Sequence, residues 1–266
     1  MGMIMEIVKF TETVFSDKGK KGILTPDSDG YYEVVVGALN SYNSAGEYYT
    51  SEGVIQLFEK SSHFMRRIKS GALYAELGHP KKQPGMSMEQ FYNRVISIEE
   101  TNVCGHFSEI NLDFDFGKKN PQLNNNELIG IIAKVKPAGA KANALQIALE
   151  NPKQNSAFSI RGLTENNHRN GRVERRLTNI ITFDHIIEPG ISVACKQYAP
   201  GLENLIVSES YSVTETTDIS INKTIMKKVL TSNISIYGLE SSKQELFNDI
   251  LKTLDRNNQP NRLSKW

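Results

Sequence analysis

A serine beside a cation is the first feature of this chain that could do chemistry. The alternation of apolar and polar residues over 156–162 predicts a short strand, which we expect to break at Gly162. Side chains two residues apart on a strand share a face, so Ser159 and Arg161 lie on the same side. A serine attacks efficiently only when a base takes its proton and a third group orients that base. Ser156 is a weaker second candidate, and the base and the acid must be sought elsewhere.

The chain has five candidate bases, His63, His79, His106, His168 and His185. His79 ends a short predicted strand, and its neighbours Gly78 and Pro80 fix the backbone and leave room beside the ring. This setting suits a base at the rim of a cleft, although an ordinary turn histidine fits it too. His106 lies on the apolar side of another predicted strand. It is either a core histidine bound to a neighbour or a second histidine near the catalytic one.

Asp184 is the best candidate for the third group. It lies in the largely apolar run 180–187, where a buried carboxylate is unfavourable unless it is paired or hydrogen-bonded. Such a carboxylate can orient a histidine. The adjacent His185 should point to the opposite face of a regular strand, so we do not expect it to share a site with Asp184.

Composition excludes several other classes of protein. The 266 residues carry a net charge of +1, which gives no general attraction to nucleic acid, although the arginines of 169–176 could touch phosphates. The two cysteines form no disulfide framework, and Cys104 and His106 lack the paired spacing of zinc ligands. We therefore expect no metal and no cofactor. No signal peptide and no apolar run of about 18 residues is visible, so we expect no membrane segment and a reducing, cytoplasmic setting.

The elements that must position these residues are mostly strands. We expect strands over 31–39, 72–77, 95–116, 128–135, 156–162 and 177–187, and an edge strand over 4–10. Helices are predicted over 51–69, 87–94 and 141–150, the second with a capping box of Ser87 and Gln90. The polar, basic segment 164–176 is expected to be a loop.

These elements predict an α+β fold, in which a mostly antiparallel β-barrel of about seven strands is surrounded by short helices. Strands dominate the first part of the chain, and the pattern turns helical from about Thr214. We therefore divide the chain into a domain over 1–213 and a helical C-terminal segment over 214–266.

Four segments resemble the motifs of bacteriophage prohead maturation proteases. Gly71–Pro80 (GALYAELGHP) resembles their Gly-x-Leu-x-Gly-Glu-Leu-x-His-Pro segment, and Phe158–Gly162 resembles their Ser-Ser-Arg-Gly nucleophile segment. Thr182–Asp184 followed by Pro189 resembles their Phe-Asp-x-Val-x-x-Pro segment, and Val103–His106 resembles their Val-Ser-His strand. The four segments stand in the family's order.

The resemblance covers roughly residues 71–192 and implies a role for each candidate. Ser159 would be the nucleophile, His79 the general base and Asp184 the third member. The chain departs from the family pattern at Ala75, which replaces a glycine, at Ile160, which replaces the second serine, and at Gly105, which replaces a serine. The change at Ile160 removes the ambiguity over which serine of the motif attacks.

Two further residues are implied to support the site. Backbone N–H groups near Ser159, together with Arg161, would stabilise the oxyanion. The family is similar in fold to herpesvirus assemblins, whose triad is Ser-His-His within a β-barrel. His106 is therefore the alternative to Asp184 as the third member of the triad.

The resemblance implies a serine endopeptidase that cleaves capsid, scaffold and internal head proteins inside the assembling prohead, in the cytoplasm of a bacterial host. Such proteases cut after a glutamate that follows a small or aliphatic residue by two positions, and they process themselves. Two segments of this chain fit, Gly201-Leu202-Glu203 and Gly238-Leu239-Glu240. We expect cleavage after Glu240, which would make the present chain a zymogen. The substrate glutamate would bind a cation among Arg66, Arg67, Lys81, Lys82 and Arg172.

Assemblin-like proteases often work as dimers, so a homodimer is also an expectation. Two rival functions stay open. The first is a non-catalytic capsid-assembly or scaffold protein that retains the same barrel, and the second is a nucleic-acid-binding barrel that uses the arginines of 169–176.

Overall fold

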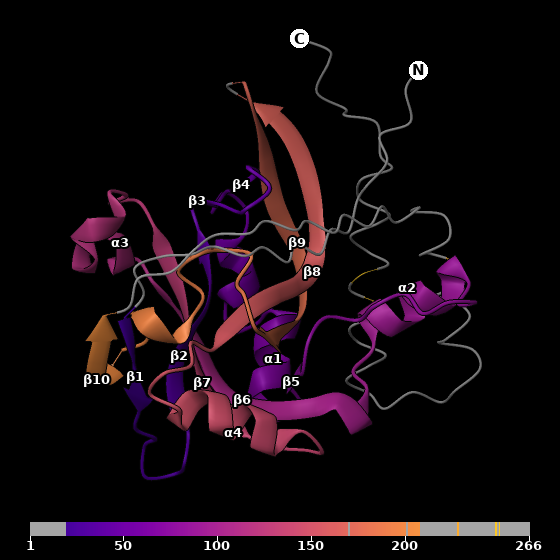
Figure 1. Cartoon of the computed structure of the whole chain (residues 1–266). Coiled ribbons are helices and arrows are strands. Elements are labelled where there is room, and N and C mark those ends of the chain that lie inside the picture. Colours follow the sequence, from indigo (N-terminus) through magenta and orange to yellow (C-terminus); the bar gives the residue numbers. More distant parts are fainter. Residues whose placement is uncertain are drawn as a thin grey trace.

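The computed structural model describes residues 20–169, 171–200 and 202–207, together with Lys228, Asn248 and Ile250. In these residues ten strands form three sheets (Figure 1). The first sheet is antiparallel and has the order β2 (Tyr32–Leu39), β7 (Ile129–Pro137), β6 (Val103–Asp113) and β5 (Tyr74–Glu76). The second has the order β3 (Ser41–Tyr42), β4 (Tyr48–Tyr49), β9 (Arg172–Ile186) and β8 (Ala157–Arg169), with only β4 and β9 parallel. The third pairs β1 (Lys20–Leu24) with β10 (Leu202–Val207).

The two larger sheets share one core. Phe107 of β6 packs edge-on against Phe158 of β8 and Phe183 of β9, with ring centroids 6.2 and 6.0 Å apart. Just after β5, Leu77 forms a parallel bridge to His185 of β9, so the sheets also meet along one edge. The α+β class and the mostly antiparallel pairing are thus confirmed, whereas a closed barrel of about seven strands is not.

Short helices surround these sheets. They are α1 (His63–Lys69), α2 (Met88–Ile96), α3 (Phe116–Lys119) and α4 (Ala142–Glu150), with 3-10 turns at Ile55–Phe58, Glu100–Asn102, Pro121–Leu123 and Lys196–Tyr198. The capping box of Ser87 and Gln90 is confirmed. The helix expected over 51–69 is wrong, because α1 starts only at His63, where the Ser62 hydroxyl accepts the N–H of Met65 at 3.1 Å. Among the helices described, none has the length and apolar character needed to cross a membrane.

The strand expected over 95–116 begins too early, because α2 continues to Ile96 and β6 starts only at Val103. A β-bulge after Phe107 then shifts the alternation of the side chains by one residue. Phe107 is buried and Ser108 is exposed, which is the reverse of the expected pattern. Local alternation cannot reveal a bulge whose position depends on the partner strand.

The strand that presents Ser159 is longer than predicted. The expected break at Gly162 is wrong, since β8 continues through a register shift between Arg161 and Gly162. A Cβ atom at Gly162 would lie 2.4 Å from the carbonyl oxygen of Asn179, so the absence of a side chain permits this close approach.

The segment 164–176 was expected to be a basic loop, but residues 164–169 lie in β8 and residues 172–176 in β9, in the part of these two strands that reaches beyond the rest of the fold in Figure 1. Its arginines pair with carboxylates: Arg169 with Glu52, Arg172 with Glu174, Arg175 with Glu47 and Arg176 with Glu165. Because each cation has an acidic neighbour, the hairpin offers little uncompensated charge to a phosphate backbone.

Candidate active site

Ser159 lies on β8 directly opposite Asp184 on β9. Residues paired across antiparallel strands point to the same face, so the two side chains lie on one side of the hairpin. Arg161 follows two residues later on β8 and shares that face, as the alternation predicted. The strand pairing thus places a serine, a carboxylate and a guanidinium together.

His79 reaches the same site from the segment after β5. The backbone N–H of Gly78 donates to the carbonyl oxygen of His185 at 2.7 Å, which fixes this segment against β9. Gly78 has a φ of +76°, a left-handed conformation that glycine adopts without strain. The ring of His79 is buried, and its Nδ1 lies 2.7 Å from Oδ2 of Asp184.

Asp184 is completely buried and bound from two sides. Arg161 donates from Nε to Oδ2 at 2.8 Å and from Nη2 to Oδ1 at 2.5 Å, while His79 binds Oδ2. Burial by itself would raise the pKa of Asp184, but the charge of Arg161 and the bond to His79 outweigh it and lower the pKa below 3.8. Asp184 is therefore a carboxylate at neutral pH and can orient His79.

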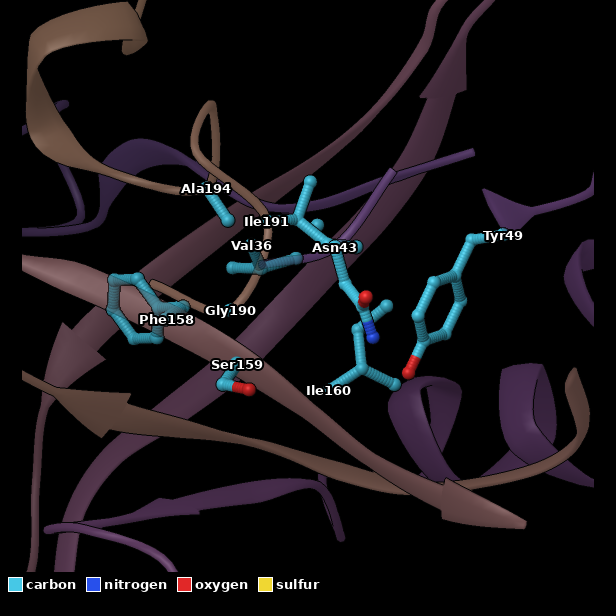
Figure 2. A pocket seen from close by; sticks show the side chains of 10 residues that line it. Val36, Asn43, Tyr49, Phe158, Ser159, Ile160, Gly190, Ile191 and Ala194 are labelled. Atoms are coloured by element: carbon cyan, nitrogen blue, oxygen red, sulfur yellow. The ribbon is translucent and has the colours of Figure 1, made fainter. Parts of the chain in front are cut away.

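Two hollows adjoin this arrangement. Ser159 borders a pocket of about 20 Å³, room for little more than a water molecule, with Phe158 and Ile160 of the same strand (Figure 2). The turn at Gly190 and Ile191 closes another side of this pocket. His79 borders a larger groove, of about 1310 Å³.

The structure brings His79 into contact with Asp184 and places Asp184 opposite Ser159. It does not join His79 to Ser159. In the part of the chain that the structure describes, no hydrogen bond links the Ser159 hydroxyl to His79. Catalytic serine–histidine bonds are often long before substrate binds and shorten in the complex. A nucleophile, an oriented imidazole and a neighbouring groove together suit acyl transfer to serine.

Comparison with known families agrees with this chemistry. The family model of the peptidase S80 family matches residues 10–250, which is most of the chain. The chain belongs to the peptidase S80 family. Membership implies a serine protease. The capsid maturation protease of Pseudomonas phage phiKZ is 33% identical over 189 residues, covering 70% of this chain and 67% of that protein. No solved structure matches the chain.

The guanidinium of Arg161 in this S80 peptidase is engaged by protein groups. It is completely buried, and besides Asp184 it binds the carbonyl oxygen of Ser97 at 2.9 Å and Oε1 of Glu76 at 3.2 Å. With these groups already engaged, we propose that Arg161 orients Asp184 rather than contacting substrate.

His106 does not lie at Asp184. Its Nδ1 is 3.0 Å from the hydroxyl of Tyr31, and its Nε2 is 3.1 Å from the carbonyl oxygen of Gly71. A carbonyl only accepts, so Nε2 bears a proton. Both ring nitrogens are occupied by these partners, which favours Asp184 as the third member.

Ser156, the competing serine, is bound elsewhere. Its hydroxyl lies 2.9 Å from Nε2 of His185, and both side chains are buried. Burial lowers the pKa of His185 to about 4, so this histidine is neutral at physiological pH. Ser156 borders neither the pocket nor the groove.

Reasoning from the sequence missed Glu76. It stands three residues before His79 within the segment Gly71–Pro80, and this position was the signal available for it. Its side chain is fully buried and lies against Arg94 and Arg161. The local sequence does not predict that Glu76 is buried, because its burial depends on strands that are far apart in the chain.

The other predicted residues are placed as follows. Among the described residues, no group of three or more histidine, cysteine or acidic side chains is arranged to hold a metal. Glu203 lies in β10, where it pairs with Ile23 of β1. Glu240, the edge strand expected over 4–10 and nearly all of the C-terminal segment fall outside the described residues.

Proposed function

We propose that this S80 peptidase matures phage capsids, with Ser159 as nucleophile, His79 as general base and Asp184 as the residue that orients the base. The hydrogen bond between His79 and Asp184, opposite Ser159 on the neighbouring strand, is the observation on which the proposal rests. The likeness to the capsid maturation protease of phage phiKZ supports the biological setting.

In the proposed mechanism His79 takes the proton of Ser159 as its oxygen attacks a peptide carbonyl. The tetrahedral oxyanion collapses to an acyl-enzyme, and the protonated His79 donates its proton to the leaving amine. A water molecule, deprotonated by His79, then attacks the ester and restores Ser159. Asp184 stays ionised and stabilises the imidazolium that forms in each half of the cycle.

The oxyanion requires N–H donors beside Ser159. The turn at Gly190 and Ile191 borders the same pocket, and the carbonyl of Gly190 accepts the N–H of Ser44 at 3.1 Å, which anchors the turn. We assign the oxyanion-binding role to backbone N–H groups of this turn.

We propose that the protease prefers glutamate as the substrate residue before the cleaved bond. The groove beside His79 limits which cationic side chains can bind this glutamate. Of the five cations expected from the sequence, Lys81 borders this groove. Arg67 is buried against the carbonyl of Ile181, and Arg172 pairs with Glu174. Lys141 also borders the groove.

Main-chain contacts link Lys141 to the segment that carries the base. The backbone N–H of Lys141 donates to the carbonyl oxygen of Val103. Val103 in turn pairs with Glu76, which stands three residues before His79. Lys141 precedes α4, whose first turn contains no acidic residue, so the positive end of this helix adds to its charge. We propose that Lys81 and Lys141 bind the substrate glutamate.

The remaining finer features are also proposals. The substrates are capsid, scaffold and internal head proteins within the prohead of an infected bacterium, and the working form is a homodimer. Residues 1–213 form the protease domain, and the segment 214–266 is a C-terminal segment that the enzyme cuts after Glu240.

Co-expression of the chain with the capsid and scaffold proteins of the same phage tests this function. Wild type should shorten these proteins, whereas Ser159→Ala should leave them intact. A non-catalytic assembly protein predicts instead that heads form normally and no protein is shortened with either variant.

A further inference from the structure

Glu76 is a fully buried carboxylate to which the proposed mechanism assigns no role. Oε1 accepts the backbone N–H of Glu99 at 2.8 Å, and Oε2 accepts the side-chain amide of Asn102 at 3.1 Å. Arg94 of α2 binds both oxygens, at 3.0 Å to Oε1. Burial would raise the pKa of Glu76, but Arg94 and Arg161 outweigh it and lower the pKa, so the group is ionised.

A continuous path of contacts runs from Glu76 to the base. Oε1 of Glu76 lies 3.2 Å from Nη2 of Arg161, and the same nitrogen lies 2.5 Å from Oδ1 of Asp184. Asp184 in turn binds His79. Arg161 is therefore held between two buried carboxylates, one on β5 and one on β9.

We propose that Glu76 and Arg161 are positioning residues: Glu76 holds the guanidinium of Arg161, and Arg161 holds the carboxylate of Asp184 in the orientation in which it binds His79. This inference rests on the proposed triad of Ser159, His79 and Asp184. Neither Glu76 nor Arg161 contacts substrate.

The geometry explains why the planar guanidinium of an arginine is needed at position 161. Arg161 meets Asp184 through Nε and Nη2 in a bidentate pair, so the carboxylate can neither rotate nor slide. The bonds to Glu99 and Asn102 fix Glu76 in the same way. The residue that anchors Arg161 thus stands only three positions before the base and shares its backbone segment.

The charges around Asp184 predict how each change acts on it. The groups that face Asp184 or its immediate partners are His79, Arg161 of β8, Glu76 of β5, the thiol of Cys104 of β6, Arg94 of α2 and Arg67 of α1. Without Arg161, burial is opposed only by His79, so the pKa of Asp184 rises. Loss of the carboxylate by protonation then begins at a higher pH.

The test measures the reactivity of Ser159 with a fluorophosphonate probe, which labels activated serines without any peptide substrate. The rate of labelling is followed against pH for wild type, Glu76→Gln, Arg161→Lys and Arg161→Met, each normalised to folded protein by circular dichroism. The control variants Glu165→Gln and Arg176→Lys make the matching changes in a pair that joins the same two strands farther out on the hairpin.

We expect labelling at the pH optimum to fall about 10- to 100-fold in Glu76→Gln and Arg161→Lys, because the base is misplaced. In Arg161→Met the acidic limb of the profile should also move to higher pH, and Arg161→Lys should restore its position but not the rate. The controls should label like wild type.

Wild-type rates and an unshifted limb in folded Glu76→Gln and Arg161→Lys would overturn the inference. If Arg161→Met does not fold, these two variants decide the question. Failure of the proposed triad gives a different result, since wild type would then not be labelled at Ser159, or Ser159→Ala would be labelled equally fast.

Discussion

The backbone N–H of Gly78 donates to the carbonyl oxygen of His185 at 2.7 Å. Each partner of this bond is the immediate neighbour of a proposed catalytic residue, His79 on one side and Asp184 on the other. The bond therefore brings together two side chains that lie 105 positions apart in the sequence. A base that depends on a main-chain contact should be sensitive to the backbone at Gly78.

Gly78→Ala tests this dependence. A Cβ at Gly78 would meet no atom within 4 Å, so the substitution acts through its φ of +76° and not through a clash. We expect a loss of stability of about 1–2 kcal/mol and a fall in kcat. Gly171→Ala is the matched control, because it has a φ of +73°, similar free space and a place at the hairpin tip. Equal kcat in the two variants would contradict the prediction.

Asp184→Asn should lower kcat by about 10⁴-fold, because the amide stabilises the wrong tautomer of the base. The same change leaves the buried charge of Arg161 with one carboxylate fewer, which should destabilise the fold by about 3 kcal/mol. Peptide hydrolysis and urea unfolding measure the two effects. A folded variant with near-normal kcat would mean that Asp184 is not the third member of the triad.

Lys81→Ala and Lys141→Ala should reduce kcat/KM for a peptide with glutamate before the cleaved bond by about fivefold each, since a partly exposed ion pair contributes about 1 kcal/mol. With glutamine in place of this glutamate, kcat/KM should differ less between wild type and the two variants. Lys82→Ala provides the control, because Lys82 is adjacent to Lys81 but does not border the groove. A loss in Lys82→Ala as large as in Lys81→Ala would argue for a general effect of charge.

Stability should fall as the pH drops below neutrality, and His185 sets where this begins. The pKa of His185 is about 4 in the folded chain, compared with 6.5 for an ordinary histidine in the unfolded chain. Between these values the unfolded chain binds a proton that the folded chain excludes, so stability decreases with falling pH, by about 1.4 kcal/mol per unit. Tm measured by circular dichroism from pH 7.5 to 4 should show this slope, and His185→Gln should flatten it.

A second acid-dependent loss follows below about pH 4.5. The pKa values of Asp184 and Glu76 are lowered in the folded chain, so their stabilisation is complete above the unfolded values of 3.8 and 4.5. It disappears as the pH falls through the folded values. Unchanged acid unfolding in Glu76→Gln would contradict this assignment.

Self-cleavage should occur after Glu240 in preference to Glu203. Glu203 is paired in β10 with β1, and a protease binds its substrate as an extended segment free of other pairing. Mass spectrometry of the purified chain should show a new C-terminus at Glu240 that is absent in Ser159→Ala and in Glu240→Gln. A product ending at Glu203 with Glu240 intact would reverse the order.

Local patterns predicted much of the fold. The Val-rich run of β2 and the capping box of α2 were visible in the sequence, because strand alternation and helix capping involve residues only a few positions apart. The helix over 51–69 was not predicted correctly, and the barrel of about seven strands is not confirmed. Helix boundaries and sheet closure depend on competition between segments and on which strands pair. Both involve residues far apart in the chain, so a short stretch of sequence does not predict them.

For the site, the sequence by itself determined which side chains are available: a serine on the same strand face as Arg161, a histidine between glycine and proline, and an aspartate in an apolar run. Only the tertiary structure decided their relations. It placed Ser159 opposite Asp184, docked His79 beside β9, and buried Glu76 and Arg161 together. Charges far apart in sequence can share a desolvated site only after the sheets have assembled, because water screens them until that point.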